Sequence, residues 1–299
     1  METAYLLMDV GGTEIKCGIS DGTGRMLVQE KFPADAKAGQ EEILSHFAQI
    51  VEALIKMAGN CAVGGVGMAF PGPFDYVNGI SLMRGLDKYD SIYGVPIAEE
   101  IQRRVPVVRN VKFKFLHDVE AFAVGVSRFG LCSSKNKIFC LGIGTGAGSA
   151  FVQDGRAIKS GKGVPENGWI YNTPFKETII DDYVSVRGLK AASQRILGEM
   201  LDGKQLYDLC VSGDAAAMKV YESFGCDIAA AAEPFIKCFC PDALVLGGQI
   251  SGSFEFFGKE LLEICKSYGT EVYLEKDTSI RAMQGLFAVM TGGDCDVKS

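Results

Sequence analysis

The chain has 299 residues, of which 47% are hydrophobic and 22% are charged, and its formal net charge is -7 at pH 7. This composition is ordinary for a folded protein and excludes a disordered or fibrous chain. The negative balance, without a long basic stripe, excludes the phosphate-neutralising surface that nucleic-acid binding requires. At this length we expect two lobes, each with its own core.

The ten cysteines show no spacing typical of a disulfide framework, and a chain of this size needs no such bonds, so we expect reduced thiols. The N-terminal stretch METAYLLMDV has no basic region before its apolar run, and Asp9 interrupts that run. Charged residues also interrupt the most apolar later region, 228–248. We therefore expect no membrane span, no export signal and a cytoplasmic location.

The first predicted element is an apolar strand that runs into Asp9 and a glycine turn, in LLMDVGGTEIKCGISDGTGRML (residues 6–27). A second strand, a polar turn and a third strand follow. A strand can end in such residues for local reasons alone. At glycine turns, however, backbone amides can approach phosphate oxygens closely, because no Cβ intervenes.

A helix and two strands are predicted next. Residues 41–57 place apolar side chains on one helical face, and the buried-looking strand 62–70 runs into the turn Pro71-Gly72-Pro73. After a strand at 111–116, Asp118 lies where a helical pattern begins. Its position fits a helix N-cap and a catalytic base equally well.

The opening pattern then recurs. Residues 138–158 again give a strand, a Gly-Thr-Gly turn, a strand, an Asp-Gly turn and a strand. One such copy is most simply a β-hairpin, but two copies indicate a duplicated unit. A helix-rich segment at 213–239, with Asp214 as a cap, leads into a last apolar strand, 243–248, which ends in paired glycines. The pattern predicts layered α/β lobes whose strand ends hold a polyphosphate.

Six motifs carry a resemblance to a known family. They are DVGGT (9–13), PGPFD (71–75), HDVEA (117–121), GIGTGAG (142–148), PENGW (165–169) and LVLGGQIS (244–251). In this order they resemble the ROK family, which groups cytoplasmic sugar kinases with related repressors. The resemblance covers nearly the whole chain. It implies an actin-like, ribonuclease H-like α/β fold in which two duplicated lobes close a cleft on ATP and a sugar.

The resemblance also implies lobe boundaries and residue roles. We expect a small lobe at 1–118, completed by a C-terminal helix at about 282–299, and a large lobe at 119–281. Asp118 matches the general base, and Asp9 matches the residue that holds the magnesium of ATP through water. The expected nucleotide contacts are Gly11, Gly12, Thr13, Gly144, Thr145, Gly146, Gly247 and Gly248. The expected sugar contacts are Gly72, His117, Glu166 and Trp169.

The chain departs from the family pattern at three places. His117 stands where the family usually has Asn, and Trp169, the only tryptophan, stands where it usually has His. Trp169 could stack on a sugar ring or fill the core. Residues 170–182 contain no cysteine, whereas many relatives carry a zinc-binding CxCGxxGCxE cluster there. We expect no structural zinc, a loop ordered by packing, and Asp181 or Asp182 near the place of the usual second sugar glutamate.

The leading hypothesis is an ATP-dependent kinase that phosphorylates a hexose or hexose derivative, most simply at the 6-hydroxyl. The alternatives are a catalytically idle sugar-binding or regulatory protein, and a kinase that uses polyphosphate. Repressors of the family carry a DNA-binding segment before the first glycine turn, and only eight residues precede Asp9 here. The sugar stays open, and the relatives suggest a homo-oligomer, either a dimer or a tetramer.

Overall fold

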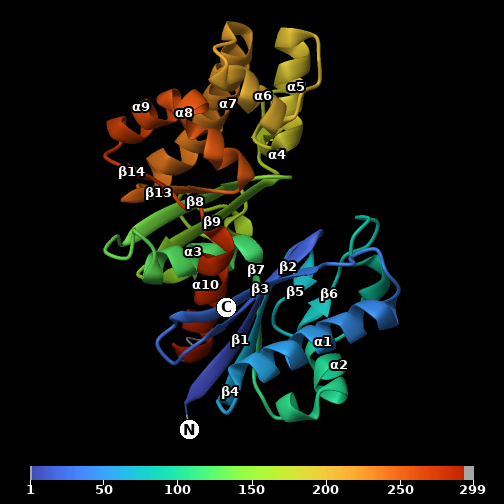
Figure 1. Ribbon diagram of the computed structural model, residues 1–299. Helices are drawn as coiled ribbons and strands as arrows, with labels where there is room; N and C mark the ends of the chain where they lie inside the picture. The colour runs from blue at the N-terminus through green and yellow to red at the C-terminus, as the bar shows by residue number, and fades with distance from the viewer. Residues whose placement is uncertain (1, 293–299) are drawn as a thin grey trace. The chain divides into compact units, whose positions relative to one another are not determined.

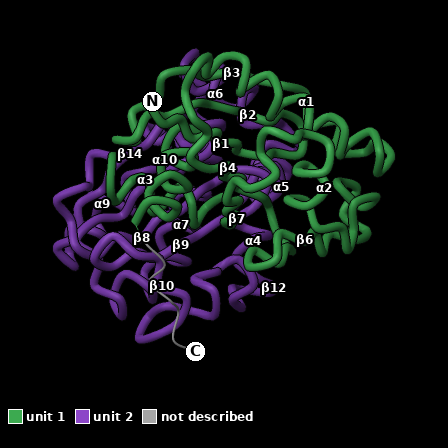
Figure 2. The backbone as a smooth tube through the Cα atoms, turned by 90° about the horizontal axis from the view of Figure 1, so that it is seen from below, with its two compact units in different colours: residues 1–129, 279–299 green, residues 130–278 purple. Residues whose placement is uncertain are grey.

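The computed structural model describes residues 2–292. The chain folds into two compact units (Figures 1 and 2). Unit 1 comprises residues 1–129 and 279–299, and unit 2 comprises residues 130–278. Figure 2 colours unit 1 green and unit 2 purple. Each unit is built on one five-stranded sheet with helices packed against it.

The sheet of unit 1 has the strand order β3-β2-β1-β4-β7. Its strands are β1 (Thr3–Val10), β2 (Glu14–Ser20), β3 (Met26–Pro33), β4 (Ala62–Phe70) and β7 (Phe113–His117). The first three form an antiparallel meander, and β4 and β7 run parallel to β1. A small hairpin, β5 (Phe74–Asp75) and β6 (Ile80–Ser81), follows β4.

The helices of unit 1 are α1 (Gln40–Ala58), α2 (Ile97–Arg104), α3 (Asp118–Phe129) and α10 (Thr278–Thr291), with short 3-10 turns at Asp90–Ile92 and Pro106–Val108. The apolar face predicted for the first helix is buried, with Ile43, Phe47, Ile50, Val51 and Leu54 in the core. The C-terminal helix, expected at about 282–299, corresponds to α10, which begins a few residues earlier, at Thr278. Its expected part beyond residue 292 lies outside the described residues.

The sheet of unit 2 has the order β10-β9-β8-β13-β14. Its strands are β8 (Lys137–Ile143), β9 (Ala147–Gln153), β10 (Arg156–Ile158), β13 (Ala243–Gly247) and β14 (Glu271–Leu274). Its helices are α4 (Ile180–Tyr183), α5 (Val186–Leu197), α6 (Gly203–Val211), α7 (Ala215–Phe239), α8 (Phe254–Phe257) and α9 (Lys259–Ser267). A hairpin of β11 (Pro174–Phe175) and β12 (Thr178–Ile179) and 3-10 turns at Glu166–Gly168 and Gln249–Ser253 complete the unit.

The two sheets have one topology. In each, an antiparallel meander of three strands is followed by two strands that run parallel to the first of the three. The repeat read from the sequence is therefore confirmed at the level of strand order and direction. Asp214 also has its predicted place, since its Oδ1 accepts the amides of Ala216 and Ala217 at the start of α7.

The units divide later in the chain than the expected lobes, because α3 and α10 pack backbone against backbone within unit 1. A Cβ on Gly125 would lie 1.7 Å from the carbonyl oxygen of Arg281, and one on Gly285 would lie 1.9 Å from that of Ala121. Only glycine allows so close an approach. The expected boundary after residue 118 had placed α3 in the other lobe.

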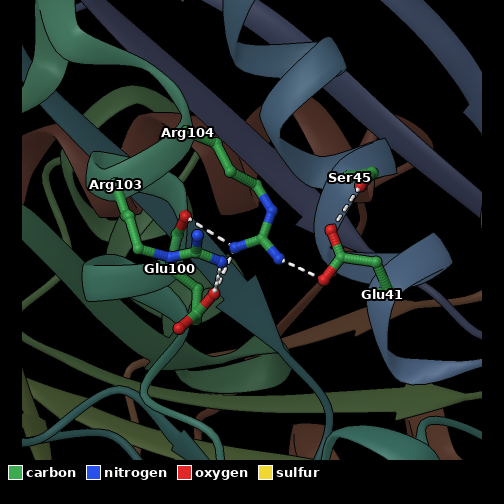
Figure 3. A network of polar contacts seen from close by, with 5 residues as sticks. All are labelled: Glu41, Ser45, Glu100, Arg103 and Arg104. Atoms are coloured by element: carbon green, nitrogen blue, oxygen red, sulfur yellow. Dashed lines mark hydrogen bonds and ion pairs between the residues drawn. The ribbon is translucent and has the colours of Figure 1, made fainter.

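An ionic network ties α2 to α1 (Figure 3). Arg104 donates through Nη2 to Glu41 of α1 at 2.6 Å, and through Nη1 to the carboxylate of Glu100 one turn earlier on α2. Arg103 donates to the same carboxylate at 2.9 Å. Hydrogen bonds from Arg104 and Arg103 lower the pKa of Glu100. The Arg104 side chain is only 12% exposed, so its two acidic partners compensate a largely buried charge.

Two expectations concern the whole chain. All nine cysteines that lie among the described residues are free thiols. Within residues 2–292 there is also no helix with the length and apolar character that a membrane crossing requires.

Candidate active site

The first glycine turn joins β1 to β2 in unit 1. The Gly11 amide donates to the Glu14 carbonyl at 3.0 Å, and a Cβ on Gly11 would lie 2.7 Å from that oxygen. The buried Tyr89 donates its hydroxyl to the Gly11 carbonyl at 2.8 Å. Gly12 and Thr13 are exposed. The turn is thus held from inside the unit, while its two outer residues stay open to a ligand.

Asp9 precedes this turn at the end of β1, opposite Lys16 of β2. Burial raises the pKa of Asp9 from 3.8 to about 6, and the charge of Asp118 adds to the rise. A hydrogen bond from Ser279, in the first turn of α10, and the charge of Lys16 oppose it. Asp9 is thus an enclosed carboxylate for which a nearby cation would be favourable.

Asp118 begins α3 directly after β7. Its Oδ1 accepts the Val119 amide at 2.7 Å and lies 3.1 Å from Nδ1 of His117. The side chain is 39% exposed. The carboxylate therefore contacts the first turn of the helix and still reaches solvent, as a base must.

Gly72 lies beside His117, at the end of the neighbouring strand β4. A Cβ on Gly72 would lie 3.7 Å from Cδ2 of His117 and 3.5 Å from the hydroxyl of Tyr76. That hydroxyl donates to the Phe70 carbonyl at 3.0 Å. Burial raises the pKa of Tyr76, and the charges of Asp118 and a further carboxylate on α3 add to the rise. Tyr76 therefore stays a neutral phenol beside the expected sugar residues.

The structure brings the expected residues of unit 1 to one edge of its sheet. β1, β4 and β7 are parallel neighbours, with Asp9 opposite Ala69 and Phe70 opposite His117. Their carboxyl ends therefore meet, as in other α/β sites that hold ligands.

The second glycine turn joins β8 to β9 in unit 2. The Gly144 amide donates to the Gly146 carbonyl at 3.1 Å, and Thr145 between them is exposed. Asp181 supports the turn, because its Oδ1 accepts the Ala147 amide at 2.6 Å. The same oxygen lies 2.8 Å from the place of a Cβ on Gly146. Glycine at 146 thus leaves room for the supporting carboxylate.

The paired glycines after β13 lie against this region of unit 2. Gly248 has φ +89°, and a Cβ there would lie 2.4 Å from the carbonyl oxygen of Ile143. β13 and β8 are parallel, with Gly247 opposite Gly142. The end of β13 is therefore next to the end of β8, where the Gly-Thr-Gly turn begins.

Glu166 and Trp169 lie in the loop after β10. Glu166 opens a 3-10 turn and is exposed. Trp169 is half-buried, and its ring lies 6.2 Å from the ring of Tyr171, which is 40% exposed. The loop thus presents a carboxylate and two accessible aromatic rings, which are groups that suit a sugar.

Lys176, at the tip of the β11–β12 hairpin, ties the cysteine-free loop to α7. Its ammonium pairs with Asp227 of α7, whose side chain is 11% exposed. It also lies 4.9 Å from the ring centre of Tyr183 and 5.5 Å from that of Phe175. The two rings meet edge to face at 5.4 Å. An ion pair enclosed by aromatic rings therefore fixes this loop.

Comparison with known proteins decides the family. A sequence model described as the ROK family matches residues 5–290 of the chain. The chain belongs to the ROK family.

Two of the relatives are named as sugar kinases. The chain is 24% identical to a glucokinase of Thermotoga maritima over 283 residues, which cover 87% of this chain and 86% of the relative. It is also 24% identical to an N-acetyl-D-glucosamine kinase of Haemophilus influenzae, with 86% and 87% of the two chains covered.

Solved structures establish the fold. A ROK hexokinase of Thermus thermophilus superposes with a TM-score of 0.76 at 20% identity and covers 97% of this chain and all of its own (100%). A ROK glucokinase of Streptomyces griseus, in complex with glucose and AMPPNP, gives 0.73 at 18%, with 97% and 100% covered. A ROK transcriptional regulator, a homolog of the E. coli MLC protein, gives 0.81 at 16%, with 96% and 78% covered. The expected actin-like α/β fold is confirmed.

The chemistry of Asp9 fits the magnesium that a ROK kinase would use. Mg²⁺ in kinase sites is held by one or two carboxylates together with substrate phosphates and water. Asp9 is one enclosed carboxylate, and Asp118 is near enough to affect its pKa. Among residues 2–292, no group of three His, Cys, Asp or Glu side chains is arranged to hold a metal ion. The donor set fits a nucleotide-borne Mg²⁺ better than a protein-only cage.

Several residues of the site carried no motif. Sequence reasoning missed Tyr89, Ser279 and Arg187, a residue of α5 that pairs with Asp181, and it left the role of Asp181 open. Tyr89 is 78 residues from the turn it supports, and Asp181 is 34 residues from the amide it accepts. A local pattern does not report pairings of this kind. For Arg187, its position six residues after Asp181 was the only available signal.

Proposed function

We propose that the protein is an ATP-dependent kinase that transfers the γ-phosphoryl group to a hexose or hexose derivative, at the 6-hydroxyl, with Asp118 as general base. The Asp118 carboxylate carries the proposal. Its Oδ1 is held by the Val119 amide and lies 3.1 Å from Nδ1 of His117, and the side chain is 39% exposed. We assign Oδ2 as the oxygen that accepts the hydroxyl proton.

The nucleotide side of the proposal assigns the phosphates to the two glycine turns. Phosphoryl transfer depends mainly on positioning and on neutralising the charge of the transferred group. The residues Gly12, Thr13 and Thr145 are exposed, and we assign their backbone amides to phosphate oxygens. Asp9 would hold Mg²⁺ through water, and that ion would neutralise phosphate charge when bound. The AMPPNP complex of a relative supports ATP as the donor.

The sugar side of the proposal uses Gly72, His117, Glu166 and Trp169. Glu166 is exposed and can accept hydrogen bonds from sugar hydroxyls. Gly72 leaves space beside the His117 ring. We propose that Trp169 stacks on the apolar face of the sugar, since its ring is half-buried and lies beside an exposed tyrosine.

The regulatory alternative has support from the fold of a ROK transcriptional regulator, which superposes with a TM-score of 0.81. Fold alone does not decide between the two functions. The accessible Asp118 carboxylate and the two supported glycine turns favour the kinase. A cytoplasmic location and a dimer or tetramer stay predictions, the latter to be checked by light scattering.

The test is ADP release with Mg-ATP over a panel of glucose, mannose, fructose, N-acetylglucosamine and N-acetylmannosamine, with polyphosphate as donor in parallel. We expect at least one sugar to give ADP and sugar phosphate in equal amounts, with phosphorus–proton couplings that place the phosphate on C6. If no sugar is phosphorylated by either donor while a sugar still raises the melting temperature, the idle or regulatory alternative holds.

A further inference from the structure

Arg187 lies on the second glycine turn. It is the second residue of α5, whose first amide, that of Val186, donates to the Gly144 carbonyl at 2.9 Å. Nη1 of Arg187 lies 3.5 Å from the Thr145 carbonyl, and Nη2 pairs with Oδ2 of Asp181. The guanidinium is thus held at the middle residue of the turn by contacts on two sides.

The charges around the turn show why a cation there is needed. The side chains of Asp181 and Asp182 are 17% and 46% exposed, and both lie within 4.0 Å of Nη2 of Arg187. Two carboxylates would repel a phosphate that approached the turn. Arg187 offsets their charge.

The guanidinium also keeps donors for a ligand. Its five N–H groups form a planar fork that matches phosphate oxygens. Two nitrogens contact Asp181 and Thr145, and the side chain is 56% exposed. An ion pair whose cation is 56% exposed adds little to stability, so support of the turn is a weak reason for this arrangement.

We propose that Arg187 binds the β- or γ-phosphate of the nucleotide at the turn formed by residues 144–146, and that Asp181 is its positioning residue. The inference rests on the proposed kinase function and deepens it. On binding, the phosphate takes up donors of Arg187 that now face solvent, while Asp181 keeps the Ala147 amide and so preserves the turn.

The test measures binding of ATP, ADP and AMP, each with Mg²⁺, to the full chain by calorimetry. Arg187→Gln removes the cation, Arg187→Lys keeps the charge without the fork, and Arg195→Gln is the matched control. Arg195 lies on the same helix and donates to Ser223 at 3.1 Å. Melting temperatures verify that each variant is folded.

We expect Arg187→Gln to weaken ATP binding by about 10- to 100-fold, the usual effect of losing a charged hydrogen bond. ADP binding weakens equally if the contacted group is the β-phosphate, and stays unchanged if it is the γ-phosphate. AMP, which lacks the contacted phosphate, changes by less than about twofold, and so does every ligand in the Arg195→Gln control. Arg187→Lys falls between wild type and Arg187→Gln, because it keeps the charge without the planar fork.

Two results would overturn the inference. Unchanged ATP affinity in Arg187→Gln would show that Arg187 does not contact the phosphate. An equal loss of affinity for ATP, ADP and AMP would show that Arg187 only supports the turn. If Arg187→Gln does not fold, Arg187→Lys decides by the same comparison. A wild-type protein that binds no ATP defeats the proposed function as well, whereas wild-type binding with an unaffected variant defeats only this inference.

Discussion

Replacing Asp9 with asparagine should stabilise the protein at neutral pH while removing its activity. The folded pKa of Asp9 is about 6, compared with an ordinary value of 3.8, because burial disfavours the charged form. At pH values between these two pKa values, Asp9 keeps a proton in the native state that it has released in the unfolded state. Stability therefore falls as pH rises from about 4 to about 6, and then levels off.

The magnitude follows from the size of the shift. A difference of about 2 pH units corresponds to about 3 kcal/mol of lost stability above pH 6. Asparagine has the same shape without the charge and can still accept the hydroxyl of Ser279. Asp9→Asn is therefore expected to match wild type near pH 4 and to exceed it by up to about 3 kcal/mol near pH 7.

Urea unfolding at several pH values from 4 to 7.5 measures the effect. Asp21→Asn is the control, because hydrogen bonds from Thr23 lower the pKa of the exposed Asp21 and predict no gain at neutral pH. A stability curve of Asp9→Asn that runs parallel to that of wild type over this range would refute the reasoning.

Three further predictions concern unit 2. Lys176→Gln leaves the buried carboxylate of Asp227 without its cation and should lower the free energy of unfolding by about 1–3 kcal/mol, whereas Lys204→Gln removes an exposed pair and should cause little change. Urea unfolding measures both variants, and equal losses would contradict the role of the Lys176–Asp227 pair. Gly146→Ala places a Cβ 2.8 Å from a carboxylate oxygen of Asp181 and should weaken ATP binding. The control Gly22→Ala, at an exposed turn outside the proposed site, meets nothing within 4 Å and should leave the affinity unchanged; equal affinities of the two variants by calorimetry would contradict the role of the turn. The fluorescence of Trp169, the only tryptophan, should change when a turned-over sugar saturates the protein, and a constant spectrum would argue against stacking.

Residue spacing within single segments predicted several individual helices, strands and turns of the fold. The apolar face of α1 follows from helical spacing, and β4 was expected at 62–70, the range in which it lies. The repeated glycine turns of β1–β2 and β8–β9 revealed the duplication, because both copies keep turn chemistry at matching places. The strand-end positions of Asp9 and Asp118 followed from the same reasoning.

Pairings between distant segments were beyond the reach of the sequence. The cysteine-free loop was expected to be ordered by packing, and the Tyr183 ring does lie against Lys176. The ion pair Lys176–Asp227, which also holds this loop, joins residues 51 apart and carried no sequence signal. The units divide after residue 129 and not near residue 118, because α3 and α10 approach each other through glycines. Glycine is equally common in turns, so its presence in the sequence did not reveal this helix contact.

Asp118→Asn tests the central claim most directly, because it removes the proposed base and keeps the side chain's shape. Turnover should fall by about 10²- to 10⁴-fold, while ATP and sugar still bind with nearly wild-type affinity. The control is Asp154→Asn, an equal charge change at an exposed turn where φ is +53°, which asparagine tolerates. Turnover of Asp118→Asn close to that of wild type would contradict the account.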